Sequence, residues 1–173
     1  MTGYEPKIGS VKEEALYKPF TLKRLTDYDP SEQSEGSGSL ITGKQLKDDI
    51  FENIDMLFNS RSHASSTELN AYEELDQSVL GYGITDFCGR PSSTASRDSL
   101  REHIFSQIRF FEPRLDPASL SIELQDIKGG DSTSIEYRIS GNIRVKEVNE
   151  EVAFISRLNL ESDSAELRPG SGD

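Results

Sequence analysis

The pattern of apolar residues changes partway along the chain, and this change constrains the fold more than any other feature of the sequence. Before Pro113 the apolar residues recur at helical spacing, whereas after Pro117 they alternate with polar residues. Helical spacing predicts amphipathic helices, and alternation predicts strands with one buried face. Helices followed by strands indicate an α+β domain, with helices packed on one face of a mainly antiparallel sheet of three or four strands.

Two segments are expected to form long helices. The first covers residues 43–59, where the T-x-x-Q spacing of Thr42 and Gln45 is typical of a capping box. The second covers residues 99–111 and ends before Pro113, because a proline disfavours helical angles in the residue before it. A short helix over residues 68–75 is expected in the loop between them.

The second half of the domain is expected to form an antiparallel β-meander. Reversals are favoured at residues 129–131 (Gly-Gly-Asp) and 149–151 (Asn-Glu-Glu), where glycine, aspartate and asparagine suit turns. Gly141 falls on the apolar parity of its strand, which predicts a bulge or a bend. The alternating positions that define the strands are Leu120, Ile122, Leu124, Ile135, Tyr137, Ile139, Ile143, Val145, Val152, Phe154, Leu158 and Leu160.

Apolar residues are concentrated in the middle of the chain, which sets the expected domain boundaries. Residues 1–39 are poor in apolar side chains and end in a Ser/Gly/Glu-rich stretch, so we expect a flexible N-terminal arm. Residues 40–160 are expected to form a single domain, and residues 161–173 a disordered acidic tail. The apolar patch at residues 20–25 is typical either of a docking peptide or of a segment that folds back on its own domain.

Charge and composition exclude several classes of function. The chain has 19 basic and 31 acidic residues, a formal net charge of −12, which disfavours nucleic-acid binding because that needs clustered Lys and Arg. The N-terminus lacks the apolar run of a secretory signal, and no later stretch approaches the ~20 apolar residues that span a bilayer. A single cysteine, Cys88, excludes an intrachain disulfide. We therefore expect a cytoplasmic protein without membrane insertion.

The sequence offers little catalytic or metal-binding chemistry. It has no Gly-rich phosphate loop, paired-His metal motif or nucleophile elbow. His63 and His103 lie far apart, with no third ligand at a recognisable spacing, so structural histidines are expected and no metal or cofactor is predicted. Cys88 and His103 would be a nucleophile pair only if the fold brought them together, and nothing in the sequence places them so.

The segment at residues 110–115, Phe-Phe-Glu-Pro-Arg-Leu, places a carboxylate and a guanidinium on either side of a proline at a helix exit. By itself this is typical of a helix stop with a local contact between Glu112 and Arg114. Glu112 and Asp116 would also suit the two carboxylates of a glycosidase. With 31 acidic residues such a pair arises by chance, and the chain has no tryptophan to line a carbohydrate cleft.

Four stretches of the chain carry motifs in a fixed order. They are residues 22–25 (Leu-Lys-Arg-Leu, followed by Asp27), 54–61, 78–87 and 108–115. Together they resemble TssE, the family of baseplate wedge subunits of bacterial type VI secretion systems, and the related wedge proteins of contractile phage tails. The family pattern departs from this chain at Ser60 and Gly81, where it has threonine and asparagine, whereas Glu-Pro-Arg-Leu at residues 112–115 matches completely.

The resemblance implies a structural role without enzymatic activity. Glu112, Pro113 and Arg114 are then expected to contact the bundle of the neighbouring wedge proteins TssF and TssG, and Arg114→Ala to spare the isolated fold while abolishing incorporation. The family's sheet engages strands of the sheath, which an exposed strand within residues 135–160 would allow by edge addition. The possible sheath-contact strands are those that carry Ile143, Val145, Val152 and Phe154. Further implied neighbours are the baseplate protein TssK, the sheath proteins TssB and TssC and the spike protein VgrG, in a six-fold assembly docked at the inner membrane.

The sequence leaves two alternative functions open. The family was long labelled lysozyme-like, which would make the chain a peptidoglycan hydrolase with Glu112 as its acid. A related bacterial anti-adaptor shares the fold and binds a response regulator, so a regulatory binding module is the other alternative.

Overall fold

The computed structural model describes residues 17–26, 30–31, 40–62, 72, 77–86, 94–125, 133–145, 150–162 and 164–170. The chain divides into two units, Met1–Leu46 and Lys47–Asp173. Its elements, in chain order, are α1 (Thr21–Leu25), α2 (Gly43–Phe58), the 3-10 turn η2 (Val79–Gly81), α4 (Thr94–Phe111), β1 (Ser121–Gln125), β2 (Ser134–Asn142), β3 (Glu151–Asn159) and β4 (Ser164–Pro169).

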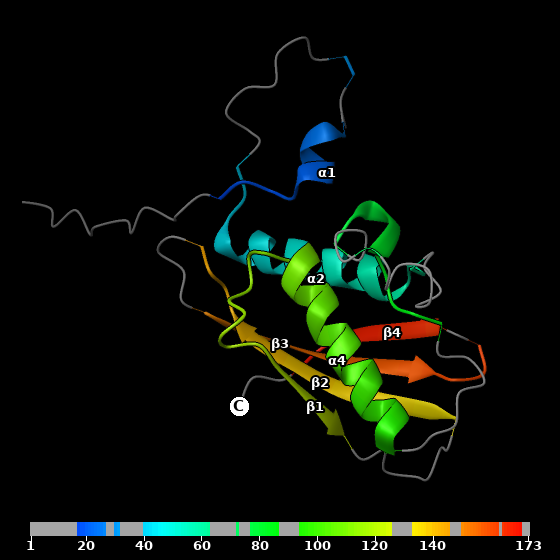
Figure 1. Cartoon of the computed structure of the whole chain (residues 1–173). Helices are drawn as coiled ribbons and strands as arrows, with labels where there is room; N and C mark the ends of the chain where they lie inside the picture. Colours follow the sequence, from blue (N-terminus) through cyan, green and yellow to red (C-terminus); the bar gives the residue numbers. More distant parts are fainter. Residues whose placement is uncertain are drawn as a thin grey trace, which may run out of the picture. The chain divides into compact units, whose positions relative to one another are not determined.

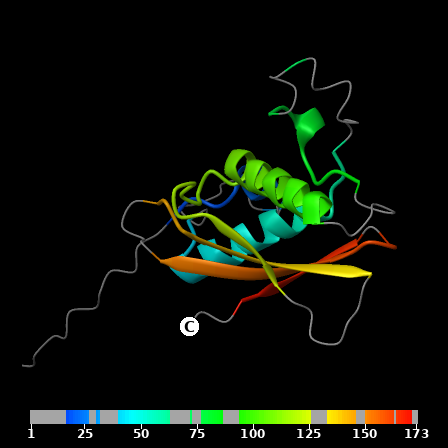
Figure 2. The ribbon, with the colours of Figure 1, turned by 60° about the horizontal axis from the view of Figure 1, so that its bottom comes forward.

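The strands form one four-stranded antiparallel sheet in the order β1-β2-β3-β4, so each strand pairs with its neighbour in sequence. Helix α4 and residues 47–58 of α2 lie on the same face of this sheet (Figures 1 and 2). This arrangement confirms the predicted α+β class with its C-terminal meander. Both helices turn an apolar stripe to the sheet because isoleucine and leucine recur at helical spacing.

The core between helices and sheet follows the predicted periodicities. Alternate residues of β2 and β3 are buried, as expected of strands with one covered face. Phe51 of α2 contacts Phe154 of β3, with ring centroids 5.7 Å apart. The side chains with no exposed surface include Ile50, Ile54, Leu57, Phe58, Ile104, Ile108, Ile139 and Leu158.

The first unit contains a loop closed by a backbone pair. The N–H of Tyr17 donates to the carbonyl of Ile41 and the N–H of Ile41 donates back to Tyr17, both at 2.7 Å. Helix α1 lies in the sequence between these paired residues. The predicted capping box is also present at the start of α2, since Thr42 and Gln45 each accept the other's N–H through a side-chain oxygen.

Three details differ from the sequence-based predictions. Helix α4 begins at Thr94 instead of residue 99. Gly141 pairs with Val152 in an unbroken register, so the predicted bulge is wrong. Disorder is also wrong for residues 164–169, which form β4: main-chain pairing with β3 holds this strand, although none of its side chains is fully buried. The turns predicted around residues 129–131 and 149, and almost all of the helix predicted at 68–75, lie outside the described residues.

Candidate functional site

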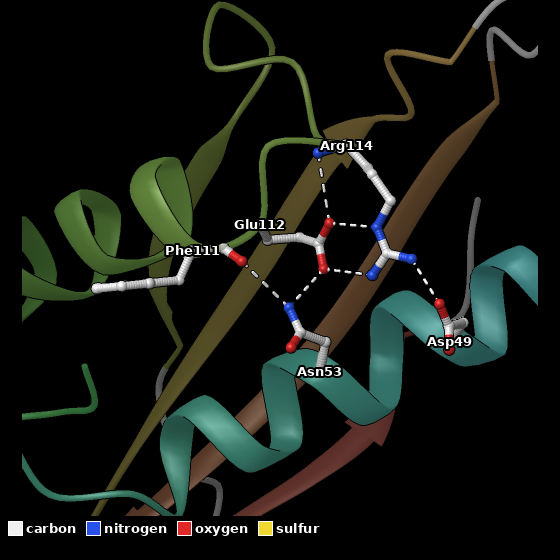
Figure 3. A network of polar contacts seen from close by, with 5 residues as sticks. All are labelled: Asp49, Asn53, Phe111, Glu112 and Arg114. Carbon is white, nitrogen blue, oxygen red and sulfur yellow. Dashed lines mark hydrogen bonds and ion pairs between the residues drawn. The ribbon is translucent and has the colours of Figure 1, made fainter. Parts of the chain in front are cut away.

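The Glu-Pro-Arg turn at the end of α4 is built around a paired carboxylate and guanidinium. Glu112 Oε1 accepts a hydrogen bond from Arg114 Nε at 2.6 Å, and Glu112 Oε2 accepts one from Arg114 Nη2 at 2.6 Å (Figure 3). The main-chain N–H of Arg114 adds a longer bond to Oε1, at 3.3 Å. A bidentate pair of this kind is both strong and geometrically specific. The local contact predicted from the sequence is therefore present.

Helix α2 supplies the rest of the network, which the sequence did not reveal. Asn53 Nδ2 donates to Glu112 Oε2 at 2.7 Å and to the carbonyl of Phe111 at 3.2 Å. Arg114 Nη1 donates to Asp49 Oδ2 at 2.6 Å. Asp49 and Asn53 are four residues apart, so they project from the same face of α2 toward the turn (Figure 3). The turn is thereby attached to α2 through both of its charged side chains.

The network is buried, so the loss of any one of its charged partners would be costly in free energy. Glu112 and Asp49 are 1% and 2% exposed, and the Arg114 side chain is 15% exposed. Desolvation lowers the pKa of Arg114, but hydrogen bonds and charge from Glu112 and then Asp49 more than compensate, so the pKa lies above its ordinary value. Arg114 therefore stays charged, and removing it would leave two carboxylates buried without their cation.

The loop at residues 78–86 is attached to the end of α2 by its main chain. Ile84 N–H donates to the carbonyl of Ser60 at 2.9 Å, and Ser62 N–H donates to the carbonyl of Ile84 at 3.3 Å. Gly83 has a φ of +110°, and a Cβ there would lie 2.5 Å from the carbonyl oxygen of Ser60. Only glycine fits this close approach. Arg61 completes the end of α2 by donating to the carbonyl of Phe58 at 2.9 Å.

The same loop runs along one face of α4. Thr85 N–H donates to His103 Nε2 at 3.2 Å, and Gly83 N–H donates to the buried Gln107 Oε1 at 3.2 Å. Tyr82 packs edge-on against Phe111, with ring centroids 5.1 Å apart. Burial and then the charge of Glu112 raise the pKa of Tyr82. His103 has the structural role that the sequence predicted, because it positions the loop.

Three of the four motif stretches therefore meet around the C-terminal ends of α2 and α4. Ser60 and Ile84 join residues 54–61 to 78–87, and Tyr82 and Phe111 join 78–87 to 108–115. Among their polar residues, Glu112 and Arg114 face inward and hold the turn in place, whereas Asn59, Asp86 and Arg109 are exposed. The large apolar side chains that they leave exposed are Val79 (88%), Leu80 (51%), Met56 (40%) and Phe110 (40%), and Pro113 is exposed as well.

The residues suggested as sheath contacts occupy a different environment. Ile143, Val152 and Phe154 are at most 5% exposed, and β3 lies between β2 and β4. Their side chains belong to the core, because apolar alternation marks the face of a strand that packs on the helices and does not mark the edge of the sheet. That the strands carrying these residues contact the sheath stays a prediction. Val145 is half-buried beyond the end of β2.

The geometry does not favour a hydrolytic site. Both oxygens of Glu112 accept hydrogen bonds in a buried network, whereas a general acid must reach substrate with a transferable proton. Asp116 uses Oδ1 to accept the N–H of Ala118 in its own turn, at 3.2 Å. Among the residues that the structure describes, no group of His, Cys, Asp or Glu has a metal-binding arrangement. His63 and Cys88 lie outside them.

No helix in the described part of the chain combines the length and apolar character that a bilayer span requires. Residues 44–148 match the family described as baseplate wedge protein gp25. This match covers more than half of the chain and includes the Glu-Pro-Arg turn, the loop at 78–86 and the first two strands. Neither a curated protein nor a solved structure matches the chain significantly.

Proposed function

The chain belongs to the gp25 family of baseplate wedge proteins, and from this premise we propose that it is a non-enzymatic subunit of a type VI secretion baseplate. Family membership indicates a structural component of a contractile-tail baseplate that associates with other baseplate proteins. The resemblance of its motifs to TssE supports a more specific role, that of a wedge that links a core of TssF and TssG to the sheath. Neither alternative function, hydrolase or anti-adaptor, has a specific observation in its favour.

The observation that carries the proposal is that the Glu-Pro-Arg turn buries its two charged residues and exposes its proline. Glu112 and Arg114 point inward and bind α2, whereas Pro113 between them is exposed. We propose that Pro113 touches the TssF–TssG bundle and that the two charged residues hold it at a fixed position. A turn that is rigid before binding loses little entropy on association, which favours affinity.

The exposed loop residues extend the proposed contact surface. Val79 and Leu80 stand on η2, which is closed by bonds from Leu80 N–H to Ser78 Oγ and from Gly81 N–H to the carbonyl of Ser78. Apolar side chains on a fixed support are typical of protein interfaces. TssK, the sheath proteins TssB and TssC and the spike VgrG would lie nearby in an assembly at the cytoplasmic face of the inner membrane.

The test is co-purification of the full chain with co-expressed TssF and TssG. Pro113→Glu places a charge at the proposed contact without altering the buried network, and it should lose most of the bound TssF and TssG. Ala118→Glu is the matched control, because Ala118 is also exposed and lies just after the motif. Both variants should unfold near the wild-type temperature. Wild-type recovery of both partners by Pro113→Glu would refute this contact, and their absence from the wild-type sample would refute the role.

A further inference from the structure

The segment at residues 17–26 is anchored at its first residue and exposed near its end. The main-chain pair with Ile41 holds Tyr17, whose side chain is only 8% exposed. The ring of Tyr17 lies beside Gly43, since a Cβ added to that glycine would be 3.9 Å from Tyr17 Cε2. Leu25, the last residue of α1, is instead 77% exposed. The chain thus fixes the start of this segment and leaves its last apolar side chain uncovered.

The segment is basic, although the chain as a whole is acidic. It contains Lys18, Lys23 and Arg24 and no carboxylate, whereas the full chain has a net charge of −12. The first carboxylates after it in the sequence are those of Asp27 and Asp29. Lys18 and Arg24 are both exposed, and neither side chain has a hydrogen bond or an ion pair in the described part of the chain. Their charges are therefore available to a binding partner.

Helix α1 orders the main chain next to these groups. The N–H of Arg24 donates to the carbonyl of Phe20 at 3.2 Å, a bond between residues four apart, as in any α-helix. A helix of five residues is too short to be stable through its own hydrogen bonds, so it needs support such as the anchor at Tyr17. Cations in the last turn suit the partial negative charge of a helix end. That effect accounts for Lys23 and Arg24 but not for Leu25, whose apolar surface is buried only if another surface covers it.

We infer that residues 17–26 dock onto another protein, at an apolar pocket that takes Leu25 and is bordered by Asp or Glu. The carboxylates of this border would bind Lys18 and Arg24. An apolar centre within a polar rim is typical of protein interfaces, and opposite charges across it steer the partners together and fix their register. The segment precedes residues 44–148, which match the baseplate wedge family. The inference therefore adds a contact that the proposed function does not include.

Two other occupants suit the segment less well. An anionic membrane surface would attract its cations, but a single exposed leucine on one helical turn buries little apolar area, and the net charge of −12 is repelled by anionic lipids. A second copy of the chain carries the same net charge, so the two copies repel each other. A protein with a local acidic pocket, and without a large negative charge of its own, avoids both costs.

Photo-crosslinking in the native cells tests the inference. The full-length tagged chain carries p-benzoylphenylalanine in place of Leu25 or, as the matched control, in place of Glu102, an exposed residue of α4. Leu25→p-benzoylphenylalanine should cross-link to one other protein, at a site that mass spectrometry maps to apolar residues close to Asp or Glu. The Glu102 variant should not give this product. A product with lipid, with a second copy or with the chain's own residues, or no product, would overturn the inference.

Charge reversal tests the role of the cations in the same cross-link. Arg24→Glu, added to the chain with p-benzoylphenylalanine at position 25, should lower the yield of the product about tenfold. Arg101→Glu, at an exposed arginine of α4, is the matched control and should leave the yield within about twofold. Changing the mapped carboxylate of the partner to Lys should recover part of the yield lost with Arg24→Glu. Equal yields from the two reversals, or no recovery, would overturn the inference.

A binding measurement on the wild-type chain covers the case in which the substitutions disturb the segment. Titration of the full-length protein with the mapped partner should give an affinity that falls about tenfold when NaCl rises from about 0.05 to about 0.5 M, because salt screens exposed charges. The amide of Leu25 should exchange more slowly in the complex, whereas the amide of Glu102 should not change. An affinity that is independent of salt, or unchanged exchange at Leu25, would overturn the inference.

Discussion

The Glu-Pro-Arg turn and the loop at residues 78–86 are attached to the helices by different kinds of interaction. The Glu-Pro-Arg turn is held by side-chain charges, which join Glu112 and Arg114 to α2 in a buried network. The loop at residues 78–86 is held by neutral contacts, most of them through its main chain. The charged attachment depends on the identity of its side chains, whereas the neutral attachment depends mainly on the backbone path, with Gly83 and Gln107 as the exceptions.

Removing the cation should have the largest effect on stability. Arg114→Ala would leave Glu112 and Asp49 buried without their partner, so the free energy of unfolding should fall by roughly 3–5 kcal/mol. Urea denaturation measures the change, with Arg109→Ala, an exposed arginine of α4, as the control. This expectation replaces the sequence-based one, in which Arg114→Ala spared the fold. A loss no greater than that of the control would show that the charged attachment is not structural.

A Cβ added at Gly83, in the neutral attachment, should have the next largest effect on stability. Gly83→Ala would place a Cβ 2.5 Å from the Ser60 carbonyl at a positive φ, which should cost about 2–3 kcal/mol. Gly141→Ala is the matched control, because its Cβ would find its nearest neighbour at an ordinary 3.6 Å. Thermal unfolding compares the two. Equal midpoints would mean that the loop can move away from α2 without loss.

Removing one neutral acceptor should have a smaller effect than either of these changes. Gln107→Leu deprives the buried N–H of Gly83 of its partner, which should lower the free energy of unfolding by about 1–2 kcal/mol. Amide exchange at Gly83 gives the specific readout, since the change should accelerate exchange there. The exchange of Arg114 N–H, which belongs to the charged attachment, should stay as in wild type. Acceleration at both sites would show that the two attachments are one cooperative unit.

The sequence predicted those elements in which apolar residues recur at a regular spacing. Alternation and helical spacing predicted α2 and the meander, because burial of one face dictates where apolar residues recur. The α2 partners of the turn were not predictable. Asn53 binds Glu112 and Asp49 binds Arg114, yet both lie some sixty residues away among polar residues of a helix, where polarity is typical of solvent exposure. Strand β4 was not predicted because main-chain hydrogen bonds hold it, and these do not require particular side chains.

A pH titration separates charged from neutral attachments with the smallest perturbation. At the other end of α4, the Tyr137 hydroxyl donates to the carbonyl of Arg97 at 2.9 Å, and burial raises the pKa of Tyr137 to about 12. A raised pKa favours the protonated form in the folded state, so this stabilisation is complete below pH 10 and is lost as the pH rises toward 12.

Tyr137→Phe should therefore cost about 1 kcal/mol near pH 8, and the difference from wild type should shrink as the pH rises through this window. The pKa of Arg114 is raised above an already high value, so the cost of Arg114→Ala should stay constant over the same range. Urea denaturation of the three proteins between pH 8 and 12 gives both differences. If the Arg114→Ala difference shrinks together with that of Tyr137→Phe, the charged attachment is not the independent element that its geometry indicates.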